Sequence, residues 1–141
     1  MSDANPDRPP ALQRWHEIVM TRNAAALDDL LAEDVIFYSP VVHTPQVGRA
    51  KTKLYLGAAL RVLFSAEFRY IGEWIGEKSA VLEFSTRIGA IEVNGVDIIG
   101  WNAEGCIDQF KVMLRPLKAI QAVQDKMQEK IAEMLAALGP R

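Results

Sequence analysis

Cysteine and histidine are both scarce in this sequence of 141 residues, and their scarcity limits the chemistry that the chain can perform. Cys106 is the only cysteine, so no disulfide can form within the chain and no cage of thiolates can hold a metal ion. The two histidines, His16 and His43, do not make a conventional zinc site without carboxylates, and their spacing indicates none. We therefore expect no metal and no cofactor. A single unpaired cysteine is consistent with a cytoplasmic protein, which is the location we expect.

Long apolar runs and strong charge are absent as well. No apolar run approaches the roughly 18 residues that a membrane-spanning helix needs, and residues 1–15 contain no apolar segment of the kind found in signal peptides. The net charge is -2, with acidic and basic residues interspersed, so no basic patch predicts binding to nucleic acid. Glycine-rich nucleotide loops, paired metal-binding histidines and the nucleophile elbow of hydrolases are also missing. We expect neither nucleic acid nor a membrane among the partners.

Half of the residues are apolar, which is enough for one domain with a sizeable core. Residues 1–10 hold three prolines and are expected to form a flexible tail. Apolar residues then recur at helical spacing, with Leu12, Trp15 and Ile18 on one face. The expected elements of this half are a helix over 10–23, a short helix over 23–35 with Asn23 as its N-cap, a strand over 35–40, a loop over 41–48 and a helix over 49–65.

Beyond residue 66 the apolar period changes from helical to two, which indicates antiparallel strands. The chain can reverse before the third of these strands either at Gly89 or at Asn94-Gly95, and reversal at Gly89 puts Asp97 in mid-strand with Asn94-Gly95 as a bulge. Helices followed by a run of strands are typical of the α+β class. The elements expected here are strands over 66–76, 79–88, about 90–103 and 106–116, a turn over 102–105, and a last helix over 117–138 with an apolar stripe that must be buried.

Asp97 lies on an otherwise apolar strand, with Val96 and Ile98 beside it. Burial of a lone carboxylate costs several kcal/mol or shifts the group to its neutral form. Two explanations are open. The carboxylate can be tied to the backbone or to a cation such as Arg87, or reach water at a hairpin end. Alternatively, it has a function as a polar group inside an apolar site.

Three segments together resemble the NTF2-like superfamily, particularly its polyketide-cyclase-like (SnoaL-like) and ketosteroid-isomerase-like members. They are "RWHEIVMTRNAAALDDLLAEDVIFYSP", "PQVGRAKTKLYL" and "GVDIIGWNAEGCIDQF", in this order and at this spacing. The resemblance covers residues 11–116, with the helix over 117–138 added to it and expected to pack on the domain or on a dimer. It implies a cone in which a curved antiparallel sheet wraps around the first helices and encloses an apolar pocket. It also implies a homodimer that forms through the outer face of the sheet.

The resemblance places the three working groups of a ketosteroid isomerase at Trp15, Ser39 and Asp97. Asp97 matches the protonated aspartate, but Trp15 stands in place of a tyrosine and Ser39 in place of the aspartate base. An indole N–H donates a hydrogen bond but is a poor acid, and a serine cannot act as a carboxylate base. We therefore do not expect ketosteroid isomerisation by the mechanism of the family. His43 could act as the base instead, or it is a solvated loop residue; His16 is expected at the surface, about 100 degrees around the helix from Trp15.

The predicted site thus combines two titratable residues, Asp97 and His43, with a ligand-binding set. This set comprises Trp15, Phe37, Ser39, Tyr55, Phe64, Phe84, Trp101 and Phe110. For the aromatic members, ordinary core packing is the alternative interpretation. Two functions remain open. One is an isomerase-, cyclase- or hydrolase-like enzyme for a small apolar molecule with a carbonyl or similar oxygen. The other is a binding or dimerisation module without turnover.

Overall fold

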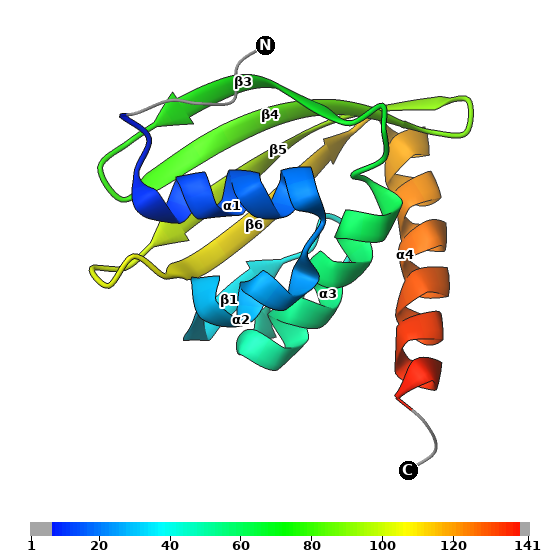
Figure 1. Cartoon of the computed structure of the whole chain (residues 1–141). Coiled ribbons are helices and arrows are strands. Elements are labelled where there is room, and N and C mark those ends of the chain that lie inside the picture. The colour runs from blue at the N-terminus through cyan, green and yellow to red at the C-terminus, as the bar shows by residue number, and fades with distance from the viewer. Residues whose placement is uncertain (1–6, 139–141) are drawn as a thin grey trace.

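The computed structural model describes residues 7–138 and shows a curved six-stranded sheet with helices on its concave face (Figure 1). The strand order is β2-β1-β6-β5-β4-β3. The helical elements are α1 Pro10–Thr21, the 3-10 turn η1 Ala24–Ala26, α2 Leu27–Leu30, α3 Arg49–Val62 and α4 Leu117–Ala137. The strands are β1 Leu31–Tyr38, β2 Gln46–Val47, β3 Arg69–Ile75, β4 Ser79–Ile88, β5 Ile91–Trp101 and β6 Ile107–Arg115. The predicted α+β class, with a curved sheet and a C-terminal helix, is confirmed.

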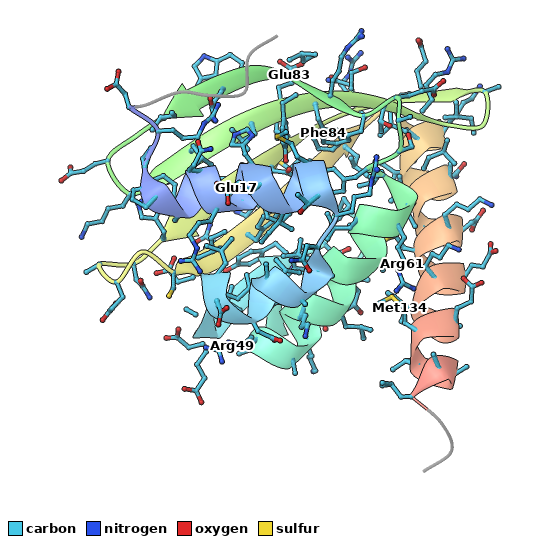
Figure 2. The ribbon with its side chains drawn as sticks, viewed as in Figure 1. Glu17, Arg49, Arg61, Glu83, Phe84 and Met134 are labelled. Carbon is cyan, nitrogen blue, oxygen red and sulfur yellow. The ribbon has the colours of Figure 1, made fainter. Side chains whose placement is uncertain are left out.

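Strand β4 shows the alternation that the sequence predicts. Leu82, Phe84 and Thr86 are buried, whereas the residues between them are less so. Figure 2 shows Phe84 directed toward α1 and its neighbour Glu83 on the opposite side of the sheet. The period of two therefore separates an inner face, which forms the core with α1 and α3, from an outer face.

The chain reverses between β4 and β5 at Gly89, which has a positive φ of 60°. From Ile88 paired with Ile91 onward, the two strands stay in register, so the bulge expected at Asn94-Gly95 is wrong. Gly95 instead lies inside the ladder, where a Cβ atom would come within 2.6 Å of the Met113 carbonyl oxygen and of Phe84. Gly95 thus allows the Phe84 ring to pack against the backbone of β5. Gly95 is not needed for a hairpin turn, because the chain reverses at Gly89.

Two differences from the predicted elements occur in the first half of the chain. The short helix ends at Leu30 and β1 begins at Leu31, four residues earlier than the expected strand, because Leu31, Val35 and Phe37 are buried in the core. Asn23 precedes η1 but donates or accepts no capping bond through its side chain. The expected loop over 41–48 contains the two-residue strand β2, which pairs with β1.

Helix α4 begins at the end of β6, where it contacts β5 and β6, and runs on beside α3 (Figure 1). Its buried residues, Ala119 and Val123, belong to the first two turns. Farther along, Met134 packs on α3, where its Cε atom would lie 3.3 Å from a Cβ atom at Gly57. The apolar stripe of α4 is therefore buried on the same domain for part of its length. Within residues 7–138, no helix is long and apolar enough to cross a membrane.

Candidate functional site

Three side chains from three elements form a hydrogen-bond chain between α1 and the inner face of the sheet. The indole Nε1 of Trp15 on α1 donates to the hydroxyl oxygen of Tyr70 on β3 at 2.9 Å. The Tyr70 hydroxyl donates to Oδ2 of Asp97 on β5 at 2.5 Å. Asp97 is only 3% exposed, so it is neither wet nor paired with Arg87, which is exposed. Its partner is a neutral hydroxyl group.

This environment controls the charge of Asp97. Burial raises the pKa of its carboxyl group to about 7, although the hydrogen bond from Tyr70 acts in the opposite direction. Burial, and then the proximity of Asp97, raise the pKa of the Tyr70 hydroxyl well above its usual value. At neutral pH, Tyr70 therefore keeps its hydroxyl proton and donates a hydrogen bond with it. The carboxyl group of Asp97 is protonated in about half of the molecules at this pH.

The sequence interpretation missed Tyr70. A signal was present, because Phe68 and Tyr70 alternate at the start of an expected strand and a tyrosine on an inner face needs a partner for its hydroxyl. The partner could not be identified from the sequence. Tyr70 pairs with Phe84, which pairs with Gly95, and this register brings β3 within reach of Asp97 two strands away.

His16 is buried, so the expectation that it lies at the surface is wrong. Its Nε2 atom lies 2.8 Å from Glu73 Oε2, and its ring contacts the edge of Tyr70 with centroids 5.4 Å apart. Arg8 donates two further hydrogen bonds to Glu73, at 3.0 and 2.9 Å. Burial alone would raise the pKa of Glu73, but the hydrogen bonds from Arg8 and His16 lower it overall. Both Trp15 and His16 of α1 therefore reach residues of β3, namely Tyr70 and Glu73.

The aromatic residues predicted to bind a ligand lie in the core. Trp15 contacts Phe110 and Phe64, with ring centroids 4.8 and 6.1 Å apart, and Phe37 stacks on Tyr55 at 5.6 Å. Phe84 and Trp101 belong to the same apolar cluster, and Tyr55 is partly buried against it. These aromatic residues therefore pack in the core. That any of them contacts a ligand stays a prediction.

Ser39 and His43 lie together in a surface hollow of about 620 Å³, next to the end of β1. The other lining residues are Tyr38, Pro40, Val42, Pro45, Lys111, Val112, Met113 and Leu114. Asp97 does not line this hollow. Its register partner on β6, Val112, does line it. The Ser39 hydroxyl accepts hydrogen bonds from the backbone N–H groups of Val41 and Val42, at 3.1 and 3.4 Å. The two predicted titratable residues are therefore not brought together.

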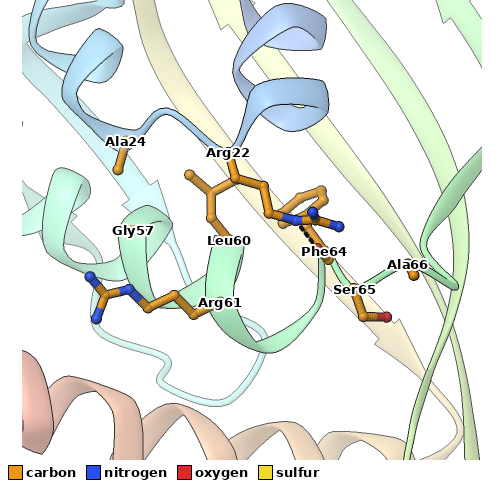
Figure 3. Close-up of a pocket in the computed structure, with 8 residues that line it drawn as sticks. All are labelled: Arg22, Ala24, Gly57, Leu60, Arg61, Phe64, Ser65 and Ala66. Atoms are coloured by element: carbon orange, nitrogen blue, oxygen red, sulfur yellow. Dashed lines mark hydrogen bonds between the residues drawn. The ribbon is translucent and has the colours of Figure 1, made fainter.

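A second hollow, of about 430 Å³, lies between the end of α1 and α3 (Figure 3). Arg22 extends toward Phe64, whose carbonyl oxygen accepts a hydrogen bond from its Nε atom, whereas Arg61 extends the opposite way. The two guanidinium groups do not converge on one point. Among residues 7–138, no group of three or more His, Cys, Asp or Glu could hold a metal ion.

No protein-family model and no curated protein matches this chain. Its structure is similar to a crystal structure of a steroid delta-isomerase from Pseudomonas aeruginosa, with 32% identity, coverage of 96% of this chain and 99% of that chain, and a TM-score of 0.86. An uncharacterized bacterial protein with a cystatin-like fold from Silicibacter pomeroyi is 33% identical, with 89% and 87% coverage and a TM-score of 0.81. An NTF2-like protein of unknown function from Mesorhizobium loti shares the fold at 16% identity, with 80% and 98% coverage and a TM-score of 0.66. This chain therefore belongs to the NTF2-like superfamily, with isomerase- and cyclase-type proteins among its structural relatives.

Proposed function

We propose that this protein binds a small apolar molecule through one oxygen atom, which the carboxyl group of Asp97 holds. The observation that carries this proposal is the hydrogen-bond chain from Trp15 through Tyr70 to Asp97. It occupies only Oδ2 of the carboxyl group, and Oδ1 forms no hydrogen bond to any residue of 7–138. A buried acid with one unused oxygen is suited to hold a polar atom of a ligand.

The surroundings of Asp97 support an apolar ligand. Its neighbours across the sheet are Leu82 on β4 and Val112 on β6, and Phe84 and Phe110 lie on the same inner face. A ligand in these surroundings exchanges water for apolar contacts over most of its area, so a hydrogen bond to Asp97 would fix its orientation. Val112 also lines the hollow with Ser39 and His43, and we propose this hollow as the entrance.

Catalysis of an isomerase type is a second candidate, because a relative with 32% identity is named a steroid delta-isomerase. In that reaction class, Asp97 would polarise a carbonyl group, and His43 or a water molecule would transfer the proton. Ser39 stands at the position expected for an aspartate base, and a serine cannot act as a carboxylate base. The binding function does not need a base and agrees with the separation of His43 from Asp97.

A thermal-shift screen with steroids, aromatic polyketide-like compounds and fatty acids tests the binding function. We expect one class to raise the melting temperature of the wild type and to have a clearly smaller effect on Asp97→Asn. The exposed Asp125 provides the matched control Asp125→Asn, which should respond like the wild type. Ligands that stabilise all three proteins equally would exclude Asp97 as a contact. Conversion of a β,γ-unsaturated ketosteroid to its conjugated isomer, lost in Asp97→Asn and in His43→Ala, would establish the catalytic candidate.

We also propose that two copies associate through the outer face of the sheet, in the cytoplasm. Adjacent strands place apolar residues side by side on this face: Trp74 beside Val81, Val81 beside Ile98, and Val96 beside Met113. Trp74 is 59% exposed and Met113 is 52% exposed in the single chain. Glu83 and Lys111 lie among these residues on the same face, and exposed apolar residues grouped in this way support an interface.

A further inference from the structure

Trp74 on β3 is 59% exposed, and its ring lies against the backbone of its own strand. At Gly72, two residues before it on the outer face, a Cβ atom would come within 2.7 and 2.8 Å of the Trp74 ring. The ring therefore lies over Gly72, and a side chain at this position would push it away from the sheet. One face of the indole is thus covered by β3, and the other face is open to a second molecule.

The row of outer-face positions that starts under this indole ends in the hollow beside Ser39 and His43. By strand register, the row consists of Gly72, Glu83, Val96 and Met113. Met113 lines the hollow. Strand β1 has already ended at this level, because its last register pair joins Tyr38 to Lys111, two residues before Met113. The indole and the hollow therefore lie at opposite ends of one row, with β5 in the middle.

The hollow presents an aromatic ring and a cation. Tyr38 and Lys111 both line it, and the Nζ atom of Lys111 lies 4.9 Å from the centroid of the Tyr38 ring. Both side chains belong to the outer face, because the residues before them in the two strands, Phe37 and Phe110, are buried in the core. A lysine ammonium group is attracted to the faces of aromatic rings, and an indole is the strongest partner of this kind. The lining of the hollow is therefore suited to the open face of an indole.

The charges of the outer face favour one orientation of two copies. A two-fold axis between facing sheets can run across the strands or along them. An axis across the strands sets each strand on its own copy, so the two Glu83 residues come near each other, as do the two Lys111 residues. An axis along β5, the middle one of the five long strands, sets β4 on β6 and β3 on β1. Glu83 then approaches the partner's Lys111, and the opposite charges attract.

We infer that the Trp74 indole of each copy lies in the hollow of the other copy, against the partner's Tyr38 and the partner's Lys111. This inference rests on the proposed association through the outer face, and it adds the orientation of the two copies and their main contact. The contact forms twice, because a two-fold interface repeats every pair of residues. The indole also forms a wall of the proposed ligand entrance, so this entrance is complete only in the dimer.

A double-mutant cycle on the dimer dissociation constant, measured by sedimentation equilibrium, tests this contact. Trp74 and Lys111 are three strand spacings apart within one chain, about 14 Å, so their effects should multiply unless they meet across the interface. We expect Trp74→Leu and Lys111→Met each to weaken association about tenfold, since each removes the same contact twice. The double variant should also be about tenfold weaker, whereas independent effects would give about 100-fold. An effect of Lys111→Met that is the same with and without Trp74 overturns the contact. A wild type that stays monomeric overturns the proposed dimer, and this inference with it.

Gly72→Ala tests the position of the indole without removing it. The added methyl group displaces the ring from the strand, so we expect association to weaken about tenfold. Gly100→Ala is the matched control on the outer face, because a Cβ atom there would have ordinary contacts at 3.5 Å; its dissociation constant should stay within about twofold of the wild type. An unchanged dissociation constant in Gly72→Ala overturns the role of the flat indole. If the melting curve shows that Gly72→Ala is unfolded, the double-mutant cycle alone decides.

Discussion

At the scale of single residues, Asp97 shows which part of a site a sequence can reveal. An aspartate among apolar strand residues is visible in the sequence, because charge and hydrophobicity are properties of each position. Its partner Tyr70 is not visible, because the 2.5 Å contact depends on the pairing of three strands. His16 was misplaced for a related reason: helical periodicity predicts one buried face, but α1 contacts the sheet over a wider arc that includes Glu73.

The raised pKa of Asp97 makes the stability of the protein depend on pH. The pKa of this carboxyl group is about 7 in the folded protein, whereas that of an ordinary aspartate is 3.8, so the folded state binds more protons than the unfolded state between these values. The contribution to stability is fully present below pH ~4 and is lost as the pH rises through about 7, by about 4 kcal/mol in total. Glu73, whose pKa is lowered, acts in the opposite sense, because its contribution to stability is lost as the pH falls.

Urea unfolding at several pH values between ~4.5 and ~8 checks this dependence. We expect the free energy of unfolding of the wild type to fall with rising pH, and that of Asp97→Asn to stay nearly constant, because the amide does not ionise. Asp125→Asn should keep the wild-type slope, since Asp125 is exposed. The same slope in Asp97→Asn and in the wild type would contradict a buried, neutral Asp97.

At the scale of elements, the long helices and the alternating strands could be predicted, because each has a periodicity of its own. The boundary between α2 and β1 could not be predicted. Apolar residues such as Leu31 and Val35 can be buried on a helix or on a strand, and tertiary packing decides which of the two forms. The choice between a reversal at Gly89 and one at Asn94-Gly95 could not be made from the local sequence either. Its physical reason, the Phe84 ring against Gly95, is a contact between two strands and is not visible locally.

Helix α4 provides a test at this scale, because its two halves are buried to different extents. Val123 is 2% exposed in the core, whereas Leu135 is 50% exposed. Val123→Ala should lower the free energy of unfolding by about 2 kcal/mol through the lost apolar contacts and the resulting cavity. Leu135→Ala, the matched control on the same helix, should change it by less than about 0.5 kcal/mol. Denaturant unfolding measures both values, and equal losses would mean that the second half of α4 is buried elsewhere, for example against another copy.

At the scale of the whole molecule, the proposed dimer can be tested by measuring the mass of the protein in solution. Met113 lies on the outer face beside Val96, and a charge there would lose its hydration in such an interface, so Met113→Asp should weaken association by more than about 100-fold. Val47 is 61% exposed on β2 at the opposite edge of the sheet, and Val47→Asp is the control that should remain dimeric. Sedimentation equilibrium gives the masses. A wild type that stays monomeric at high concentration, or a Met113→Asp variant that stays dimeric, would exclude this face.

The pairing of β1 with β6 has a consequence for how the protein is made. These strands are parallel neighbours, although one ends at Tyr38 and the other begins at Ile107. During synthesis, Phe37 therefore cannot pair with its register partner Phe110 until most of the chain has left the ribosome. Such pairing between distant segments slows folding and leaves apolar residues open to aggregation in the meantime. A nascent chain that stops before residue 107 exposes the apolar side of β1, which makes it a substrate for chaperones rather than a folded intermediate.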